Sequence, residues 1–569
     1  MANFFRSKKI NWKFLVLLLI FGIGIFLRLF RLSGFPQGFH SQEAIVGYRA
    51  FSLLTTGRDE TGRRWPFFFA SFEDYQLPVQ TYLTVISVKI FGLSPFAVRF
   101  PGAILGSFLV FAFYGLVNEF FPKNEKVAFS GAFLAAIIPW GIFSSRIAFP
   151  EGLSFSLFIL GFYLLLRKKN NIFFLLAAFV FFLLSLCTAK VSWFFLPLFL
   201  LLLSIKRKMF GLDKEVVLLT ISFLVIFVSL LVSFFRLPQA SKSILYHDLS
   251  LITDVGISNG INSMRGEELK SGNPLLGRLF FNKSFWLIKY LERFLAHFSP
   301  VYYFAIGDQN PLRGLWNFGP FYLCLIVPTL FGLWTIIKEK DEKGKFLIIW
   351  ICLGAIVSAL VKKSPDGSRL IFSFPVLLLL VSLGMKTVFN HWWRWLFIAV
   401  FVFNIAVVAF DTVQKEPIRG QRYWFYNFEK IADILKTNSD KGFTKIYLTD
   451  GYAPDPAPLL LFFWKYQPLK IQNKAKPIRF RYWMNQIDNI QIGQIDEFSI
   501  ERGETGLFVV SLKEERELLS RLVVLGKENK PTGKLCYETK KEIKDLSGKT
   551  FLLVASSVSK NCELIRLEK

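Results

Sequence analysis

The sequence predicts an α-helical membrane protein with about eleven spans, followed by an α/β domain outside the membrane. Three observations lead to this fold class. Hydrophobic residues make up 53% of the 569 residues and aromatic residues 17%, more than soluble domains carry. They gather in runs close to the ~20 residues that cross a bilayer. From residue 411 onward the apolar runs shorten to strand length and alternate with helical stretches.

The apolar runs define the predicted spans, which are 12–32, 97–119, 127–144, 151–166, 172–189, 191–205, 215–235, 318–337, 345–361, 369–386 and 393–410. The first run follows basic residues and lacks a small-residue cleavage site, so we expect a retained anchor. Alternate short connections are basic, such as Arg167–Lys169 and Lys206–Lys208. By the positive-inside rule they lie in the cytoplasm together with the N-terminus. The sequence therefore predicts a multi-pass plasma-membrane protein with its C-terminal domain outside the cell.

The basic residues also bear on the partners of the chain. Lys and Arg number 68 against 41 Asp and Glu, a formal charge of +27, which in a soluble protein would suggest nucleic acid. Here many of these cations lie in short loops between spans, where they set topology and contact anionic lipid. We therefore expect membrane lipid as a partner and no nucleic acid.

Histidine and cysteine predict no metal site, because the four His and five Cys show no metal-ligand spacing. Cys536 and Cys562 both lie in the C-terminal domain. An oxidising exterior would allow them to pair, and two unpaired thiols are equally compatible with the sequence.

The predicted domains are a transmembrane domain, 1–410, and an extracytoplasmic α/β domain, 411–569. Two long outer loops, 34–96 and 236–317, belong to the first. Helical spacing of apolar residues predicts interfacial helices at Gln42–Thr55, Leu77–Phe91 and around Phe285–Phe298. In the C-terminal domain we expect strands at Lys445–Leu448, Gly506–Ser511 and Thr550–Ala555, and helices at Tyr426–Lys436 and Lys513–Leu525.

Four acidic positions fall on the outer side of this topology: Glu43, which follows His40, Asp59 beside Glu60, Asp74 and Glu151. A carboxylate there could act as a general base that takes the proton of an acceptor hydroxyl. With a phosphate as the leaving group, one such base is enough for an inverting displacement. Any single one of these acids could equally be an ordinary solvated charge.

Arginines near the same face could hold a phosphate group, since the guanidinium fork suits phosphate oxygens. Arg99, Arg146 and Arg369 are the candidates. Arg28 and Arg31 end the first run, where snorkelling to lipid headgroups is the simpler interpretation. Three aromatic residues could be interfacial belt residues or sugar-stacking platforms, and the belt is the commoner role; they are Trp65, Trp140 and Tyr75.

A series of short motifs follows the first span: Phe39-His-Ser-Gln-Glu43-Ala, Gly57-Arg-Asp59, Pro66, Asp74-Tyr-Gln-Leu-Pro78 and Phe91-Gly-Leu-Ser-Pro-Phe-Ala-Val-Arg99-Phe-Pro. Their order resembles the N-terminal signature of the GT-C membrane glycosyltransferases. It is similar in particular to the protein O-mannosyltransferase (family 39) superfamily and its bacterial relatives, including lipid A aminoarabinose transferases. The resemblance covers about the first 190 residues; looser matches follow at His297-Phe-Ser-Pro300 with Gly307-Asp308 and at Ser368-Arg369-Leu.

This resemblance implies a GT-C-type bundle and a polyprenyl-phosphate-linked sugar donor. It also implies sugar transfer to an extracytoplasmic protein, lipid or glycan, with a catalytic acid in the first loop. No cofactor is implied, and a divalent metal stays open. The chain departs from the family pattern at Gln42, where the expected catalytic residue is Asp, and at Gln76, where Lys is common. The base would then be Glu43, Asp59 or Asp74.

Two alternatives to a transferase stay open. The Gln42 departure allows a catalytically impaired relative that serves as a scaffold. A lipid or sugar transporter is disfavoured, because the polar groups concentrate at one face and the halves show no repeat.

Overall fold

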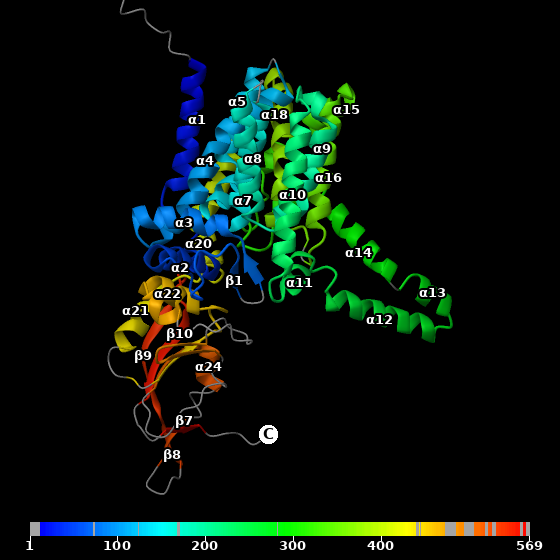
Figure 1. The fold of residues 1–569 in the computed structure, drawn as a ribbon. Coiled ribbons are helices and arrows are strands. Elements are labelled where there is room, and N and C mark those ends of the chain that lie inside the picture. Colours follow the sequence, from blue (N-terminus) through cyan, green and yellow to red (C-terminus); the bar gives the residue numbers. More distant parts are fainter. Residues whose placement is uncertain are drawn as a thin grey trace, which may run out of the picture. The chain divides into compact units, whose positions relative to one another are not determined.

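The computed structural model describes residues 12–71, 74–122, 124–167, 171–281, 283–362, 364–439, 443, 445–472, 485–493, 506–517, 522–525, 531–557 and 562–564. The chain forms two compact units (Figure 1). Unit 1 comprises Met1–Phe30, Glu73–Gln80 and Phe100–Phe410. Unit 2 comprises Arg31–Phe72, Thr81–Arg99 and Asp411–Lys569. The first outer loop therefore belongs largely to the unit that contains the C-terminal domain.

Unit 1 is helical. Its longer helices coincide with the predicted spans and are α1 (Trp12–Leu29), α4 (Pro95–Phe120, entering from unit 2), α5 (Glu125–Ile137), α6 (Pro139–Arg146), α7 (Pro150–Leu166), α8 (Ile172–Leu186), α9 (Val191–Ile205), α10 (Glu215–Phe235), α15 (Ile326–Glu339), α16 (Glu342–Ser358), α18 (Phe374–Asn390) and α19 (Arg394–Gln414). Figure 1 shows α7, α8, α9 and α10 side by side.

Shorter elements connect these helices. They are the strand β2 (Asp74–Gln76), the helices α11 (Ala240–Ser243), α12 (Val255–Lys270), α13 (Pro274–Leu279), α14 (Lys283–Ala296) and α17 (Gly367–Leu370), the 3-10 turns η1 (Arg207–Phe210), η4 (Leu323–Leu325) and η5 (Ile371–Ser373), and the π-turns η2 (Ile244–Asp248) and η3 (Tyr302–Ile306). The amphipathic helix predicted around Phe285–Phe298 is α14.

Length and apolarity qualify five helices of the described chain as membrane spans, or six if the pair α5–α6, bent by 46°, is one span. The five are α1, α4, α10, the continuous segment Gly367–Asn390 and α19. The predicted span 318–337 begins later than expected, since helix α15 starts at Ile326. A helical membrane protein with a C-terminal sheet domain is thereby confirmed, whereas the orientation in the membrane stays a prediction.

Aromatic and small residues hold unit 1 together. The ring of Phe158 in α7 packs edge-on against Phe199 of α9, with ring centroids 4.9 Å apart, and against Trp350 of α16 at 6.0 Å. Helices α15 and α18 approach closely at two glycines: a Cβ on Gly384 would lie 1.7 Å from a carbonyl oxygen of α15, and one on Gly332 2.1 Å from one of α18. Small residues allow such close helix contacts within membranes.

Unit 2 combines first-loop helices with a sheet domain. Its helices are α2 (Ser41–Thr56), α3 (Pro78–Phe91, begun in unit 1), α20 (Glu416–Gly420), α21 (Phe428–Ser439), α22 (Ala457–Trp464), α23 (Pro468–Gln472) and α24 (Leu512–Glu517). Its strands are β1 (Phe69–Ser71), β3 (Lys445–Thr449), β4 (Gln486–Ile487), β5 (Ile490–Gly493), β6 (Gly506–Ser511), β7 (Leu522–Leu525), β8 (Pro531–Leu535), β9 (Tyr537–Lys544), β10 (Thr550–Ser557) and β11 (Cys562–Leu564).

The main sheet is mixed, in the order β4-β5-β3-β6-β10-β9. Strand β3 pairs in parallel with β5 and β6, while β10 pairs antiparallel with β6 and β9. The three predicted strands and the two predicted first-loop helices are confirmed. The predicted helix Lys513–Leu525 is wrong at Leu522–Leu525, because this apolar segment with two β-branched valines forms β7, which pairs with β8 and β11.

Helix α2 packs on α22 within unit 2. A Cβ on Gly47 would lie 2.5 Å from the ring of Phe462, so only glycine permits this approach. The first loop and the C-terminal domain thus share one unit, while the side of the membrane on which they lie stays a prediction.

Candidate functional site

A network of charged side chains connects the loops of unit 1. Asp74 of β2 pairs through Oδ1 with Nζ of Lys190, which directly precedes α9, and accepts a hydrogen bond from the hydroxyl of Ser243. The same ammonium donates to the Ser243 hydroxyl at 3.0 Å. Lys190 is only 11% exposed, and a cation buried to this degree needs such partners.

Asp248 extends the network to Arg369. Its Oδ2 lies 3.2 Å from Nζ of Lys190, and its Oδ1 accepts from Nη2 of Arg369 at 2.9 Å. Nη2 of Arg369 also donates to the carbonyl oxygen of His247. The other terminal nitrogen, Nη1, is buried and has no hydrogen-bond partner among the described residues. A buried guanidinium N–H without an acceptor is costly, so this nitrogen marks a position where an anionic oxygen would be favourable.

A second group of charges lies next to Arg369 in sequence. Asp366 caps α17 by accepting from the backbone N–H of Ser368 at 3.0 Å, and it pairs with Arg313. Asp308 accepts from the backbone N–H of Gly367 at 2.8 Å. Burial raises the pKa of the Asp308 carboxyl, against the lowering effect of its backbone hydrogen bonds.

Glu151 completes the cluster. It lies in the first turn of α7, directly after Pro150, where the helix dipole stabilises a carboxylate. It is close enough to Arg369, Arg313 and Asp366 for electrostatic interaction. Within the described part of the chain, its carboxylate shows no hydrogen bond to another side chain. Among the acids of the cluster it therefore has the most capacity for a new partner.

The cluster draws on every predicted outer connection of unit 1: the end of the first loop, 146–151, the turn before α9, 236–317 and 362–369. It brings together three sequence-predicted residues, Asp74, Glu151 and Arg369. We call the eight charged residues of this group the polar cluster; they are Asp74, Glu151, Lys190, Asp248, Asp308, Arg313, Asp366 and Arg369.

Glu43 and Arg99 form a separate, fully enclosed ion pair in unit 2. Both side chains are 0% exposed, and the two oxygens of Glu43 accept from Nε and Nη2 of Arg99 at 2.9 and 2.7 Å. Arg99 also donates to the carbonyl oxygens of Leu32, Pro36 and Gly38. The pair fastens the start of the first loop to the start of α4. Both charges already have partners within the fold.

Asp59 and Glu60 serve the turn after α2. Asp59 is fully buried and accepts from the backbone N–H groups of Thr61 and Arg63, as an Asx turn does, and from the Arg63 guanidinium. Glu60 pairs with the equally buried Arg49 at 2.7 Å. The geometry explains both acids as local structure.

Arg146 and Arg28 donate hydrogen bonds to carbonyl oxygens at the ends of helices. Arg146 donates to the carbonyl oxygens of Leu27, Arg28 and Phe30 at the end of α1. Arg28 donates to those of Ala135 and Ala136 at the end of α5, where the α5–α6 pair bends. Arg28 is 0% exposed, so the snorkelling that the sequence suggested for it is wrong.

The remaining predicted residues lie at several places. His40 caps α2 by accepting from the backbone N–H of Gln42, and its ring stacks on Phe425 at 5.1 Å. Burial lowers the pKa of His40 to about 4. Gln42 is exposed, and Gln76 is half-buried in β2. The roles assigned to these side chains in binding or catalysis stay predictions, as do those of Glu43, Asp59, Asp74, Arg99, Arg146 and Arg369.

The aromatic candidates differ in exposure. Trp65 is 53% exposed, as a belt residue would be, whereas Trp140 is 7% exposed, so the belt role is wrong for Trp140. Tyr75 donates to the carbonyl oxygen of Pro238.

Sequence reasoning missed five members of the polar cluster as site residues: Lys190, Asp248, Asp308, Arg313 and Asp366. Asp366 stands in the Pro-Asp-Gly-Ser turn before Arg369, a signal that could have indicated a helix cap. Asp248 lies in a long loop without a recognisable motif. Of the cysteines, Cys536 is disulfide-bonded and Cys187, Cys324 and Cys352 are free, while the side chain of Cys562 is outside the described residues. No three His, Cys, Asp or Glu among the described residues form a group that could hold a metal ion.

No protein-family model and no curated protein matches the chain. Similar solved structures include ArnT from Cupriavidus metallidurans, in the apo state with a TM-score of 0.48 and bound to undecaprenyl phosphate with 0.49. Both are 11% identical, over 96% of this chain and 98% of ArnT. The oligosaccharyltransferase AglB from Archaeoglobus fulgidus, in complex with an inhibitory peptide and a dolichol-phosphate, is 16% identical with a TM-score of 0.44, over 80% of this chain and 63% of AglB. Because these TM-scores are below 0.5, we base the functional proposals on the residues of this chain.

Proposed function

We propose that this protein is a membrane glycosyltransferase that moves a sugar from a polyprenyl-phosphate carrier to an extracytoplasmic acceptor. The observation that carries the proposal is the buried, unpartnered Nη1 of Arg369 beside Lys190 at the loop ends of apolar helices. A guanidinium and an ammonium held in place by Asp248 are suited to a phosphate group. A lipid-linked phosphate could reach them from the membrane that surrounds the helices.

Glu151 is the proposed general base. Its carboxylate lies within electrostatic reach of Arg369 and has no side-chain hydrogen bond among the described residues. Asp74 is already bonded to Lys190 and Ser243, so we assign it to positioning the ammonium. In this proposal Glu43, whose oxygens both accept from Arg99, has a structural role.

The proposed step forms one bond and breaks another at the anomeric carbon. The acceptor hydroxyl attacks this carbon while its proton passes to Glu151, and the bond from the carbon to the phosphate oxygen breaks. Polyprenyl phosphate leaves with the bonding electrons, held by Arg369 and Lys190. Attack opposite the leaving group inverts the anomeric configuration.

The test uses the full chain in lipid nanodiscs with a panel of undecaprenyl-phosphate-linked hexoses and pentoses. Release of undecaprenyl phosphate reports turnover, and binding of undecaprenyl phosphate is measured separately. We expect Glu151→Gln to lower turnover about 100-fold or more, as loss of a general base does, with unchanged binding. Because five carboxylates of the polar cluster accompany three cations, binding is measured with and without Mg²⁺.

Glu342→Gln is the matched control, since Glu342 is a half-exposed acid at the start of α16, outside the polar cluster, paired with Lys206 and Lys345. It should leave turnover and binding unchanged. If the wild-type protein binds undecaprenyl phosphate and turns over no donor, it is a scaffold. Movement of the lipid across the bilayer without donor turnover would make it a transporter. Either result contradicts the proposal.

A further inference from the structure

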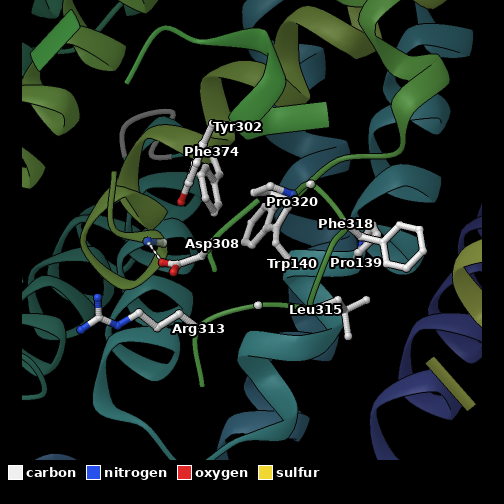
Figure 2. A pocket seen from close by; sticks show the side chains of 12 residues that line it. Pro139, Trp140, Tyr302, Asp308, Arg313, Leu315, Phe318, Pro320 and Phe374 are labelled. Atoms are coloured by element: carbon white, nitrogen blue, oxygen red, sulfur yellow. Dashed lines mark hydrogen bonds between the residues drawn. The ribbon is translucent and has the colours of Figure 1, made fainter. Parts of the chain in front are cut away.

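A pocket opens beside the polar cluster within unit 1. It is lined by the start of α6, the π-turn η3, the loop 308–320 and the residues around Gly367, and it measures about 300 Å³ when counted to its open mouth. Figure 2 shows Tyr302, Asp308 and Arg313 along one side and Leu315 and Phe318 along the other, with Trp140 between them. Arg313 and Asp308 belong to both the pocket and the polar cluster.

Two buried polar groups of the pocket lack hydrogen-bond partners. The hydroxyl of Tyr302 and the indole Nε1 of Trp140 find no partner in the part of the chain that the structure describes, and each residue is 7% exposed. Such groups normally find a partner when they are buried. The nearby Tyr303 hydroxyl is also unpartnered, but it does not line the pocket, so only the first two are available to a ligand there.

Asp308 supplies an acceptor to the same pocket. Its two oxygens accept from the backbone N–H groups of Gly367 and Asn310, and each carboxylate oxygen can accept a further hydrogen bond. The pocket thus offers an N–H donor, a hydroxyl that donates or accepts, and an acceptor. This set complements a polyol, whose hydroxyls both donate and accept. An anionic ligand would be repelled by Asp308, since the charge of Arg313 in the same lining is already paired with Asp366.

The enclosed space is small. It has room for about one ordered water molecule, and the rest of the 300 Å³ opens to solvent. A sugar ring would therefore lie at the open mouth, with one of its hydroxyls in place of that water. The ring of Trp140 is held in place by Phe155 and Phe374, with ring centroids 5.1 Å away in both cases.

We infer that this pocket binds the sugar of the lipid-linked donor, as an uncharged monosaccharide ring whose hydroxyls pair with Tyr302, Trp140 and Asp308. The inference rests on the proposed function, because the donor's phosphate would be held by the adjacent Arg369. It adds a substrate class: neutral sugars are accepted and uronic acids are rejected.

The experiment compares two lipids on the full chain in nanodiscs: undecaprenyl phosphate, and the same lipid carrying a phosphate-linked neutral hexose. The dissociation constant of undecaprenyl phosphate divided by that of the hexose-carrying lipid isolates the contribution of the sugar. In the wild-type protein we expect the hexose to tighten binding. Tyr302→Phe removes one hydroxyl and should reduce this ratio about three- to tenfold, with unchanged affinity for undecaprenyl phosphate.

Tyr303→Phe is the matched control, since it removes a buried, unpartnered hydroxyl from the next residue, outside the pocket. It should leave the ratio unchanged. Trp140→Phe keeps an aromatic ring without the N–H and should reduce the ratio as Tyr302→Phe does. Neither hydroxyl has a partner to lose, so both Tyr variants should unfold at the wild-type temperature.

The two proposals fail in different ways. If the wild-type protein does not bind undecaprenyl phosphate, the proposed function is wrong. If it binds both lipids and the ratio is the same in the wild type, Tyr302→Phe and Trp140→Phe, the pocket does not hold the sugar. A hexuronic acid in place of the hexose should bind at least tenfold more weakly, and equal binding would overturn the assignment of a neutral ring.

Discussion

The Glu43–Arg99 pair and the polar cluster contain the same kinds of residues in different states. In the pair both side chains are 0% exposed, and every contact is made within unit 2. In the polar cluster Asp74 is 27% and Arg313 31% exposed, and one nitrogen of Arg369 has no partner. The pair is thus a completed structural contact, while the cluster keeps hydrogen-bonding capacity for a ligand. Residue type alone does not separate structural from functional charges.

The largest expected effect breaks the enclosed pair. Glu43→Gln leaves the buried guanidinium of Arg99 without its counter-charge, which costs about 3–5 kcal/mol. We expect a much lower unfolding temperature and a low yield of folded protein, measured by thermal unfolding of the detergent-solubilised chain. Asp74→Asn, at a more exposed acid, is the comparison and should change the unfolding temperature less. If the Glu43→Gln protein folds normally and loses only turnover, Glu43 and not Glu151 is the general base.

The next effect concerns lipid binding. Arg369→Gln removes the proposed phosphate donor, and a hydrogen bond to a charged group is worth ~1.5–3 kcal/mol. We therefore expect about 10- to 100-fold weaker binding of undecaprenyl phosphate, measured by titration in nanodiscs. Arg167→Gln, at an exposed arginine that ends α7, is the control and should bind like the wild type. Unchanged affinity of Arg369→Gln would contradict the phosphate assignment.

Arg146 was predicted from the sequence to bind the donor phosphate. In the structure it donates to carbonyl oxygens at the end of α1, so we expect its loss to affect stability and not lipid binding. Arg146→Gln leaves buried carbonyl oxygens without donors, which costs about 1–3 kcal/mol. We expect a lower unfolding temperature together with unchanged affinity of the folded protein for undecaprenyl phosphate. A selective loss of affinity at wild-type stability would return Arg146 to the site.

A smaller, pH-dependent effect is expected in unit 2. Oδ1 of Asp455 is buried without a partner, and burial raises the pKa of this carboxyl from 3.8 to about 6, against the opposing charge of Arg49. Between these values the folded chain binds more protons than the unfolded chain, so the contribution of Asp455 to stability falls as the pH rises. Above about pH 6 its penalty is complete.

Asp455→Asn removes that penalty. The variant should be more stable than the wild type at pH 7, and the difference in unfolding temperature should shrink toward pH 4. Scans of both proteins across this range check the sign. A difference that is constant with pH would show that Asp455 titrates alike in the folded and unfolded chain.

No measurable effect is expected from Glu342→Gln. Glu342 bridges Lys206 and Lys345 at the surface, and exposed ion pairs contribute little. Thermal unfolding and lipid titration should match the wild type. A clear loss in either measurement would show that partial exposure is a poor guide to function in this molecule.

Much of the fold follows from patterns within the sequence. Long apolar runs located the helices of unit 1, and short apolar runs of strand length located β3, β6 and β10. The sequence did not predict the start of α15, which depends on how the loop around Pro320 packs. It also did not predict the strand β7, which depends on pairing with β8 and β11. The grouping of the first loop with the C-terminal domain depends likewise on Gly47 meeting Phe462.

The site was harder to predict for a related reason. Glu43, Asp74 and Glu151 look alike in sequence, as acids that precede or begin apolar helices. Only the folded chain shows that Glu43 is paired with Arg99 and Asp74 with Lys190. The carboxylate of Glu151 has no hydrogen bond to a side chain among the described residues. Asp248 and Arg313 carry no motif, and they join the polar cluster through loop positions that local propensity does not determine.

The central claim, that the polar cluster rather than the enclosed pair holds the donor phosphate, is tested most directly by a cryo-electron microscopy structure of the full chain with undecaprenyl phosphate. The account predicts the phosphate within hydrogen-bonding distance of Arg369 or Lys190. A phosphate bound at Arg99 or Arg146, with Arg369 still facing no anion, would contradict it.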